Sequence, residues 1–243
     1  MLPVAPFGVA RLLLIALLAA VVGGLAAVER KGALQLMLSR PIVLAPLLGY
    51  LLGDARGGLF LGVPLELLFL GGVNLGGSLP DNESLLAGAL TAMVVTSGLA
   101  LRTGVDEPLA ALGLALLFPL ALLGRSLERA AEVRNNQLLE LALARAQAGD
   151  PRAARVNLRG LLLPFGAAAA VCALAVLASP LLAWARQACN GTARAALAGG
   201  WHAVWALSAA CAIRAIRDHR APWISAVSAL ALVALALAVR GLT

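Results

Sequence analysis

Residues 40–83 decide how this chain folds, and their sequence is RPIVLAPLLGYLLGDARGGLFLGVPLELLFLGGVNLGGSLPDNE. Two short apolar segments in this stretch are broken by glycine and proline, and a single carboxylate, Glu66, lies deep inside the second one. An ionisable side chain within lipid-embedded sequence is costly, so it usually belongs to a substrate or ion site. The stretch therefore predicts an unusual membrane segment together with a candidate site.

The composition of the whole chain indicates an integral membrane protein. Of its 243 residues, 61% are hydrophobic and 13% are charged, and the mean hydropathy is +0.92. A water-soluble domain of this length would carry more charge. A helix needs roughly 17–25 apolar residues to cross the hydrocarbon of a bilayer. Runs of about this length lie at residues 7–28, 84–101, 108–124, 160–185, 195–213 and 221–239. We therefore expect an all-α, polytopic transmembrane fold.

Residues 41–53 and 57–80 do not fit continuous crossings. The first segment has 13 residues, which make only about 20 Å of helix. The second contains seven glycines and Pro64. Helices that break or turn back inside a membrane are tolerated only where protein shields them or where they line a cavity. We expect re-entrant or broken helices at residues 41–80, and an internal repeat as in transporter folds.

Arginine placement predicts the orientation of the chain. Residues 125–159 form the only long polar stretch and contain seven arginines, so we expect this stretch to be cytoplasmic. It divides a single membrane domain into an N-terminal half, residues 1–124, and a C-terminal half, residues 160–243. The formal charge of +7 comes mainly from arginines in this stretch and at helix ends. Arginines in these places are typical of membrane proteins, where they set the orientation of the chain in the bilayer. We therefore expect no nucleic-acid partner.

The first part of the polar stretch predicts an amphipathic surface helix. Arg125 and Glu128 lie at i,i+3 spacing and are expected to pair on the helix surface. Gly149-Asp150-Pro151 predicts where this helix stops.

Glu66 is the leading candidate for a site residue. In the functional hypothesis its carboxylate accepts hydrogen bonds from substrate hydroxyls in a water-accessible cavity. In the structural hypothesis it pairs with a basic residue such as Arg40 and holds two broken helices together. We favour the functional hypothesis because an intramembrane charge is expensive and usually retained for a task. Asn74 supplies an amide that donates and accepts hydrogen bonds, as sugar recognition requires, or that binds backbone groups near the glycines. Asp81 or Asn82 is expected to cap the following helix.

The same stretch resembles a known family. LQLMLSRPIV at residues 34–43, GYLLGD at 49–54, GGLFLGVPLELLFLG at 57–71 and NLG at 74–76 follow a recognisable order and spacing. The pattern is similar to the mannose/fructose/sorbose-family enzyme IIC, a membrane subunit of the bacterial phosphotransferase system. The resemblance is specific over residues 29–92, and the Arg-rich stretch and Gly199-Gly200 fit it more loosely.

The resemblance implies a sugar-translocating subunit in the bacterial inner membrane, within an oligomeric complex. Such a subunit pairs with a IID membrane subunit, while cytoplasmic IIA and IIB proteins pass phosphate from phosphoenolpyruvate to an incoming hexose-type sugar. By this analogy, Glu66 and Asn74 contact the sugar. Four further residues shape or support the pocket: Arg40, Asp54, Gly71 and Pro80.

We expect no catalytic residue, cofactor or metal site in this chain. By the resemblance, the partner proteins carry out the phosphoryl transfer. His202 lies within an apolar segment and His219 in a short basic loop, and neither has the neighbours of a phosphoryl-transfer site. The three cysteines stand alone, without metal-ligand spacing.

Two other functional hypotheses remain open. The first is an ion-coupled permease that uses Glu66 as a proton or ion site. The second is a non-transporting membrane scaffold or regulatory subunit. The second half of the chain permits it, because residues 205–209, Trp-Ala-Leu-Ser-Ala, stand where the family has a Gly-x-Ala-Met element.

Overall fold

The computed structural model describes residues 8–31, 36–70 and 81–216, together with residues 220, 223 and 226. The elements in this part of the chain are helical, which confirms the predicted all-α class. They are α1 (Val9–Arg30), α2 (Pro41–Leu52), α3 (Ala55–Phe69), α4 (Glu83–Leu101), α5 (Glu107–Leu117), α6 (Pro119–Gln147), η1 (Ala153–Arg155), α7 (Val156–Arg159), α8 (Leu162–Leu177), α9 (Ser179–Ala188) and α10 (Gly191–Ala215).

Several of these helices have the length and hydropathy of membrane spans. Within the described residues, four continuous regions qualify, namely α1, α4, the joined α5–α6 region and α10. The bent pair α8 and α9 would make a fifth span. These regions coincide with five of the six predicted runs and agree with a multi-pass membrane protein. The sixth run, residues 221–239, lies almost entirely outside the described residues.

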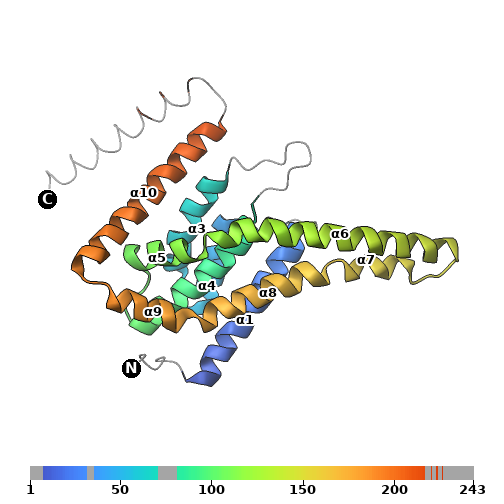
Figure 1. Ribbon diagram of the computed structural model, residues 1–243, viewed down its shortest axis with the longest axis horizontal. Helices are drawn as coiled ribbons and strands as arrows, with labels where there is room; N and C mark the ends of the chain where they lie inside the picture. Colours follow the sequence, from blue (N-terminus) through green and yellow to red (C-terminus); the bar gives the residue numbers. More distant parts are fainter. Residues whose placement is uncertain are drawn as a thin grey trace.

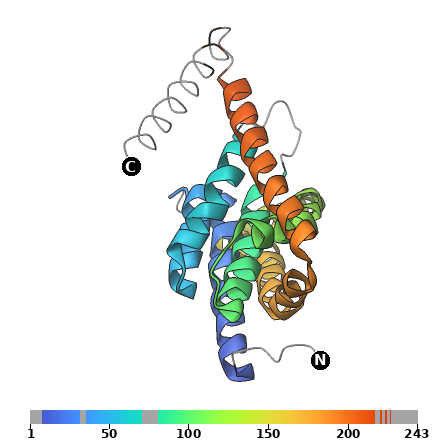
Figure 2. The same ribbon diagram turned by 90° about the vertical axis from the view of Figure 1, so that its left-hand side faces the viewer.

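Helix α4 is the centre of the fold. Every residue from Ser84 to Gly98 is buried, and α4 contacts α1, α2, α3, α5, α8 and α9 (Figures 1 and 2). A helix enclosed on all sides must be apolar on all sides, and α4 has no charged residue after Glu83. The Asn82 side chain accepts the Leu85 N–H at 2.9 Å, which confirms the predicted cap. The first turn of α4 is thereby fixed.

Helices α2 and α3 form an antiparallel hairpin packed against α4. They contain 12 and 15 residues, so their lengths are about 18 and 22 Å, which is short for a membrane crossing. Gly53 turns the chain between them with a φ of +102°, a value that favours glycine. Asp54 then caps α3 by accepting the Gly57 N–H at 2.8 Å. The hairpin has the form predicted for a re-entrant element, while residues 71–80 of that prediction lie outside the described residues.

Glycine lets α2 and α3 approach closely. A Cβ atom on Gly49 would lie 2.9 Å from the Gly58 Cα atom, and one on Gly62 would lie 2.6 Å from the Pro41 carbonyl oxygen. A Cβ atom on Gly58 would overlap the Ala45 carbonyl oxygen. Small residues at such contacts are typical of membrane helix packing. The glycines of α3 therefore serve packing, and α3 is continuous where the sequence suggested a break.

A break occurs instead between α8 and α9. Residues 160–185 predict one helix, but the structure has two helices bent by 41°. Pro180 lies in the first turn of α9, where its ring disrupts the preceding helix and its missing N–H costs nothing. The sequence predicts this span but not the bend within it. Beyond the bend, Arg186 of α9 pairs with Asp106, the cap of α5, at 2.6 Å.

Helix α6 projects from the bundle as an arm (Figure 1). It begins directly after α5 and contains 29 residues, about 44 Å of helix. It ends before Gly149, whose φ is +72°, close to the predicted stop. Elements η1 and α7 return along α6. The predicted surface helix is thus the far part of a helix that begins inside a predicted span.

The hairpin packing makes Gly58→Ala a direct stability test. The added methyl group meets backbone at Ala45, so α2 and α3 must separate. We expect a melting temperature lower by several degrees, corresponding to about 1–3 kcal/mol as in overpacked cores. Fluorescence-monitored thermal denaturation of the purified protein in detergent measures this.

Gly166→Ala is the matched control, since Gly166 is an exposed α8 residue and no atom lies within 4 Å of the place that an added methyl group would take. Its melting temperature is expected to stay unchanged or to rise slightly, because alanine favours helix. Equal melting temperatures for the two variants would contradict the close packing of the hairpin.

Candidate functional site

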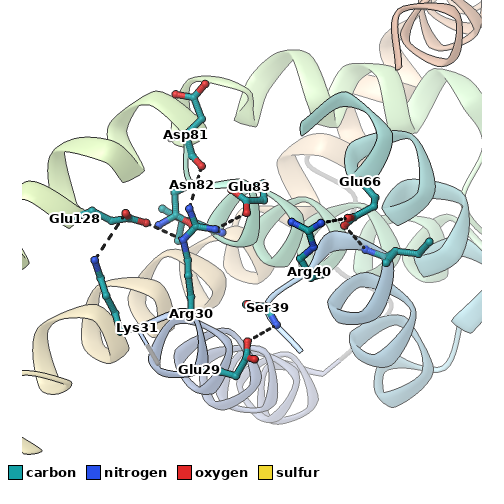
Figure 3. A network of polar contacts seen from close by, with 12 residues as sticks. Glu29, Arg30, Lys31, Ser39, Arg40, Glu66, Asp81, Asn82, Glu83 and Glu128 are labelled. Carbon is teal, nitrogen blue, oxygen red and sulfur yellow. Dashed lines mark hydrogen bonds and ion pairs between the residues drawn. The ribbon is translucent and has the colours of Figure 1, made fainter. Parts of the chain in front are cut away.

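Glu66 and Arg40 meet at the end of the α2–α3 hairpin remote from its turn (Figure 3). Arg40 Nη2 lies 3.0 Å from Glu66 Oε1, and the Ile42 N–H donates to Glu66 Oε2 at 3.4 Å. Glu66 is 9% exposed, whereas the Arg40 side chain is 42% exposed. The pair therefore joins a buried acceptor to a donor that is open to its surroundings.

This contact is the ion pair that the structural hypothesis expected, and the contacts described above leave hydrogen-bonding positions of both side chains unused. A carboxylate offers about four acceptor positions, and a guanidinium carries five N–H donors. The contacts above use two acceptor positions of Glu66 and one donor of Arg40. A hydroxyl group both donates and accepts hydrogen bonds. Arg40 can thus donate a hydrogen bond to a hydroxyl group, and Glu66 can accept one from a hydroxyl group of the same molecule.

Of the other predicted site residues, Asp54 is the one that the described part of the chain includes. Asp54 lies 12 residues before Glu66, about 18 Å along a helix, and its carboxylate caps the start of α3. The structure therefore places Asp54 at the hairpin turn and away from Glu66. Asn74, Gly71 and Pro80 lie outside the described residues.

Glu29 holds the turn that precedes α2, a role that the sequence analysis missed. Its Oε1 accepts the Met37 N–H at 2.7 Å, and its Oε2 accepts the Ser39 N–H at 2.8 Å. The available signal was a carboxylate directly after a long apolar run. That signal is weak, because charged residues are common at the ends of membrane helices.

An ion cluster lies beside these residues and joins three helices (Figure 3). Arg30 at the end of α1 contacts Glu83 of α4 at 2.5 Å and Glu128 of α6 at 2.9 Å. Lys31 lies 3.8 Å from Glu128. Glu128, in the stretch expected to be cytoplasmic, thus joins Arg30, Lys31 and Glu83 at one end of the molecule.

The ion cluster also corrects a predicted pair. Arg125 pairs with Asp81, while Glu128 pairs with the end of α1. The predicted Arg125–Glu128 pair within one helix is therefore wrong. Glu128 is buried where α6 meets the end of α1, within reach of Arg30 and Lys31.

The histidine in the described region offers no neighbouring acid or base. His202 is exposed on α10, and its Nδ1 lies 2.7 Å from the Ala198 carbonyl oxygen. Within the described ranges, no group of three His, Cys, Asp or Glu side chains could hold a metal ion. His219 lies outside these ranges.

Glu128→Gln tests the ion cluster. Removing this charge leaves the mostly buried Arg30 with one carboxylate partner and Lys31 without its partner. We expect the free energy of unfolding to fall by about 1–3 kcal/mol, since a group that loses its partner keeps its desolvation penalty. Thermal denaturation measures the effect. Glu132→Gln removes the same charge from an exposed position of α6 and should change little. An equal loss in both variants would refute the anchoring role.

Comparisons with known proteins agree on one family. The family model described as "PTS system sorbose-specific iic component" matches residues 10–224. A curated relative from Escherichia coli K12, named N-acetylgalactosamine permease IIC component 2, is 38% identical over 82 residues. These residues are 34% of this chain and 56% of the relative, so the match spans about half of the relative's length.

Solved structures share the fold. One, described only as a membrane protein, has a TM-score of 0.67 and 19% identity, covering 96% of this chain and 95% of the other. The mannose transporter ManYZ, solved with microcin E492, has a chain with a TM-score of 0.57 and 21% identity, covering 93% of both chains. Because the family model spans most of the sequence, this chain belongs to the sorbose-specific IIC family, the mannose-type membrane components of the phosphotransferase system.

Proposed function

We propose that this chain is the sugar-translocating IIC subunit of a mannose-type phosphotransferase system in a bacterial inner membrane. It binds a hexose-type sugar and moves it across the bilayer while partner proteins phosphorylate it. Membership of the family and a multi-pass helical fold support this assignment. No phosphoryl-transfer residue is assigned to this chain.

The Arg40–Glu66 pair is the observation that carries the proposal. It sits in the one described helical hairpin too short to cross a membrane, which is where transporters place their sites. Glu66 accepts hydrogen bonds from sugar hydroxyls, and the open side of Arg40 donates to them. Asn74 is proposed as a second sugar contact. Asp54, Gly71 and Pro80 are proposed as residues that support the pocket.

The proposed partners follow from the same assignment. A IID membrane subunit completes the membrane part, and cytoplasmic IIA and IIB proteins supply phosphate. The ion cluster and the arginine-rich arm lie toward one end of the molecule, which supports a cytoplasmic face there. The names of the relatives, a permease for N-acetylgalactosamine and a mannose transporter, indicate sugars to test first.

Phosphoenolpyruvate-dependent phosphorylation of labelled sugars tests the proposal. Membranes contain this chain and its IID partner, together with the soluble phosphotransferase proteins. The sugars are mannose, fructose, sorbose and N-acetylhexosamines. Glu66→Gln is expected to abolish product, because an amide cannot replace a charged acceptor that both orients Arg40 and binds hydroxyls. Asn74→Ala is expected to lower apparent sugar affinity about tenfold, the value of one hydrogen bond.

Glu132→Gln, with the same chemical change at an exposed position, is the control and should keep activity. Assembly with IID is followed by co-purification. Loss of assembly in Glu66→Gln would establish the structural hypothesis instead. A stable complex without product for any sugar would favour the scaffold or regulatory hypothesis. Uptake that needs the proton gradient but no soluble partner would favour an ion-coupled permease.

A further inference from the structure

We infer that Glu29 is a positioning residue for the Arg40–Glu66 site. It touches neither Glu66 nor the atoms that would face a sugar. It acts by holding the turn at residues 36–40. This turn fixes the backbone position from which the Arg40 side chain extends. The sugar-binding consequence of this inference rests on the proposed function, whereas the effect on the turn does not.

Glu29 binds the turn with both carboxylate oxygens. Its acceptors meet the N–H groups of Met37 and Ser39 at 2.7 and 2.8 Å, and the residue is only 7% exposed. A buried carboxylate is very costly unless hydrogen bonds compensate it, and hydrogen bonds to a charged acceptor are stronger than neutral ones. The end of α1 and the turn are therefore tied together by a contact that is expensive to break.

The turn needs such a contact because its backbone is strained. Met37 has a φ of +59°, a left-handed conformation that costs a non-glycine residue about 1–2 kcal/mol. The Arg40 N–H donates to the Met37 carbonyl oxygen at 3.2 Å, which closes the turn. The carboxylate of Glu29 satisfies the Met37 N–H and so favours this conformation over relaxed ones.

The closed turn determines the position of Arg40. The Arg40 carbonyl oxygen accepts the N–H groups of Val43 and Leu44 at 2.9 and 2.8 Å, so Arg40 begins α2. Its backbone is thereby held between the turn on one side and the helix on the other. The half-exposed Arg40 side chain has one described ionic partner, Glu66. Its approach to Glu66 therefore depends on the backbone position that the turn provides.

Glu29→Gln tests this inference with a minimal change in shape. The glutamine side chain has one acceptor oxygen, which can bind one of the two N–H groups. Its NH₂ group faces the other N–H group, and two donors form no hydrogen bond. In the phosphorylation assay we expect the apparent KM for sugar to rise about tenfold, as for one lost charged hydrogen bond. The maximal rate and co-purification with IID should stay near wild type, because Glu29 acts only on the geometry of the site.

Glu128→Gln is the matched control, since it neutralises another buried carboxylate at the same end of the molecule. It should lower the melting temperature and leave KM unchanged. A merely structural role for Glu29 would give both variants the same profile, with lower stability and unaltered KM. That result would overturn the inference.

Hydrogen exchange of the full chain in detergent provides a readout that needs no sugar. In Glu29→Gln, the amides of Met37 and Ser39 should exchange about tenfold faster, in proportion to the lost hydrogen bond. The amide of Ile42, which donates to Glu66, should also exchange faster, while α4 stays as in wild type. If the wild-type protein phosphorylates no sugar, the proposed function fails, and the Ile42 amide alone decides the inference. Unchanged exchange at Ile42 overturns it.

Discussion

The structure depends on one constraint, which is that the short α2–α3 hairpin must pack against protein along one face. A helix of 12 residues cannot cross the hydrocarbon, and the polar backbone groups at its turn would be costly in contact with lipid. The Asp54 N–H donates to the Gly49 carbonyl oxygen at 2.7 Å, and the Asp54 side chain caps α3. Helix α4 forms the wall behind the hairpin. It packs against both α2 and α3, and the close glycine contacts hold these two helices together.

Features that depend on local composition could be predicted from the sequence. The spans, the short hairpin and the cap at Asn82 each follow from length, hydropathy or one residue type. The contact between Arg40 and Glu66 was also foreseen, as the structural alternative, because a lone intramembrane carboxylate requires a partner. The sugar-binding roles of Glu66 and Asn74 stay predictions. The bend before α9 was missed because a single proline sits inside an otherwise uniform apolar run.

Contacts between distant residues could not be predicted in the same way. Glu128 binds Arg30, 98 residues away, and Arg186 binds Asp106, 80 residues away. Spacing along one helix favoured Arg125 as the partner of Glu128, but burial between helices decides which pair forms. The two halves of the chain also differ. Helix α10 is continuous through Gly199-Gly200, and nothing lies within 4 Å of a Cβ at either position. The described second half thus presents a full-length helix where the first half presents a hairpin, and the internal repeat stays a prediction.

The last two residues of α1 face different parts of the molecule. Glu29 holds the turn before the hairpin, and Arg30 holds α4 and the arm. Consecutive helical residues point about 100° apart around the axis. The last turn of α1 can therefore contact the turn before α2 on one side and helices α4 and α6 on the other. A substitution at this end of α1 therefore affects either the turn before the hairpin or the base of the arm, according to which of the two residues it replaces. The end of α1 is thus a shared attachment point for the turn before the hairpin and for the base of the arm.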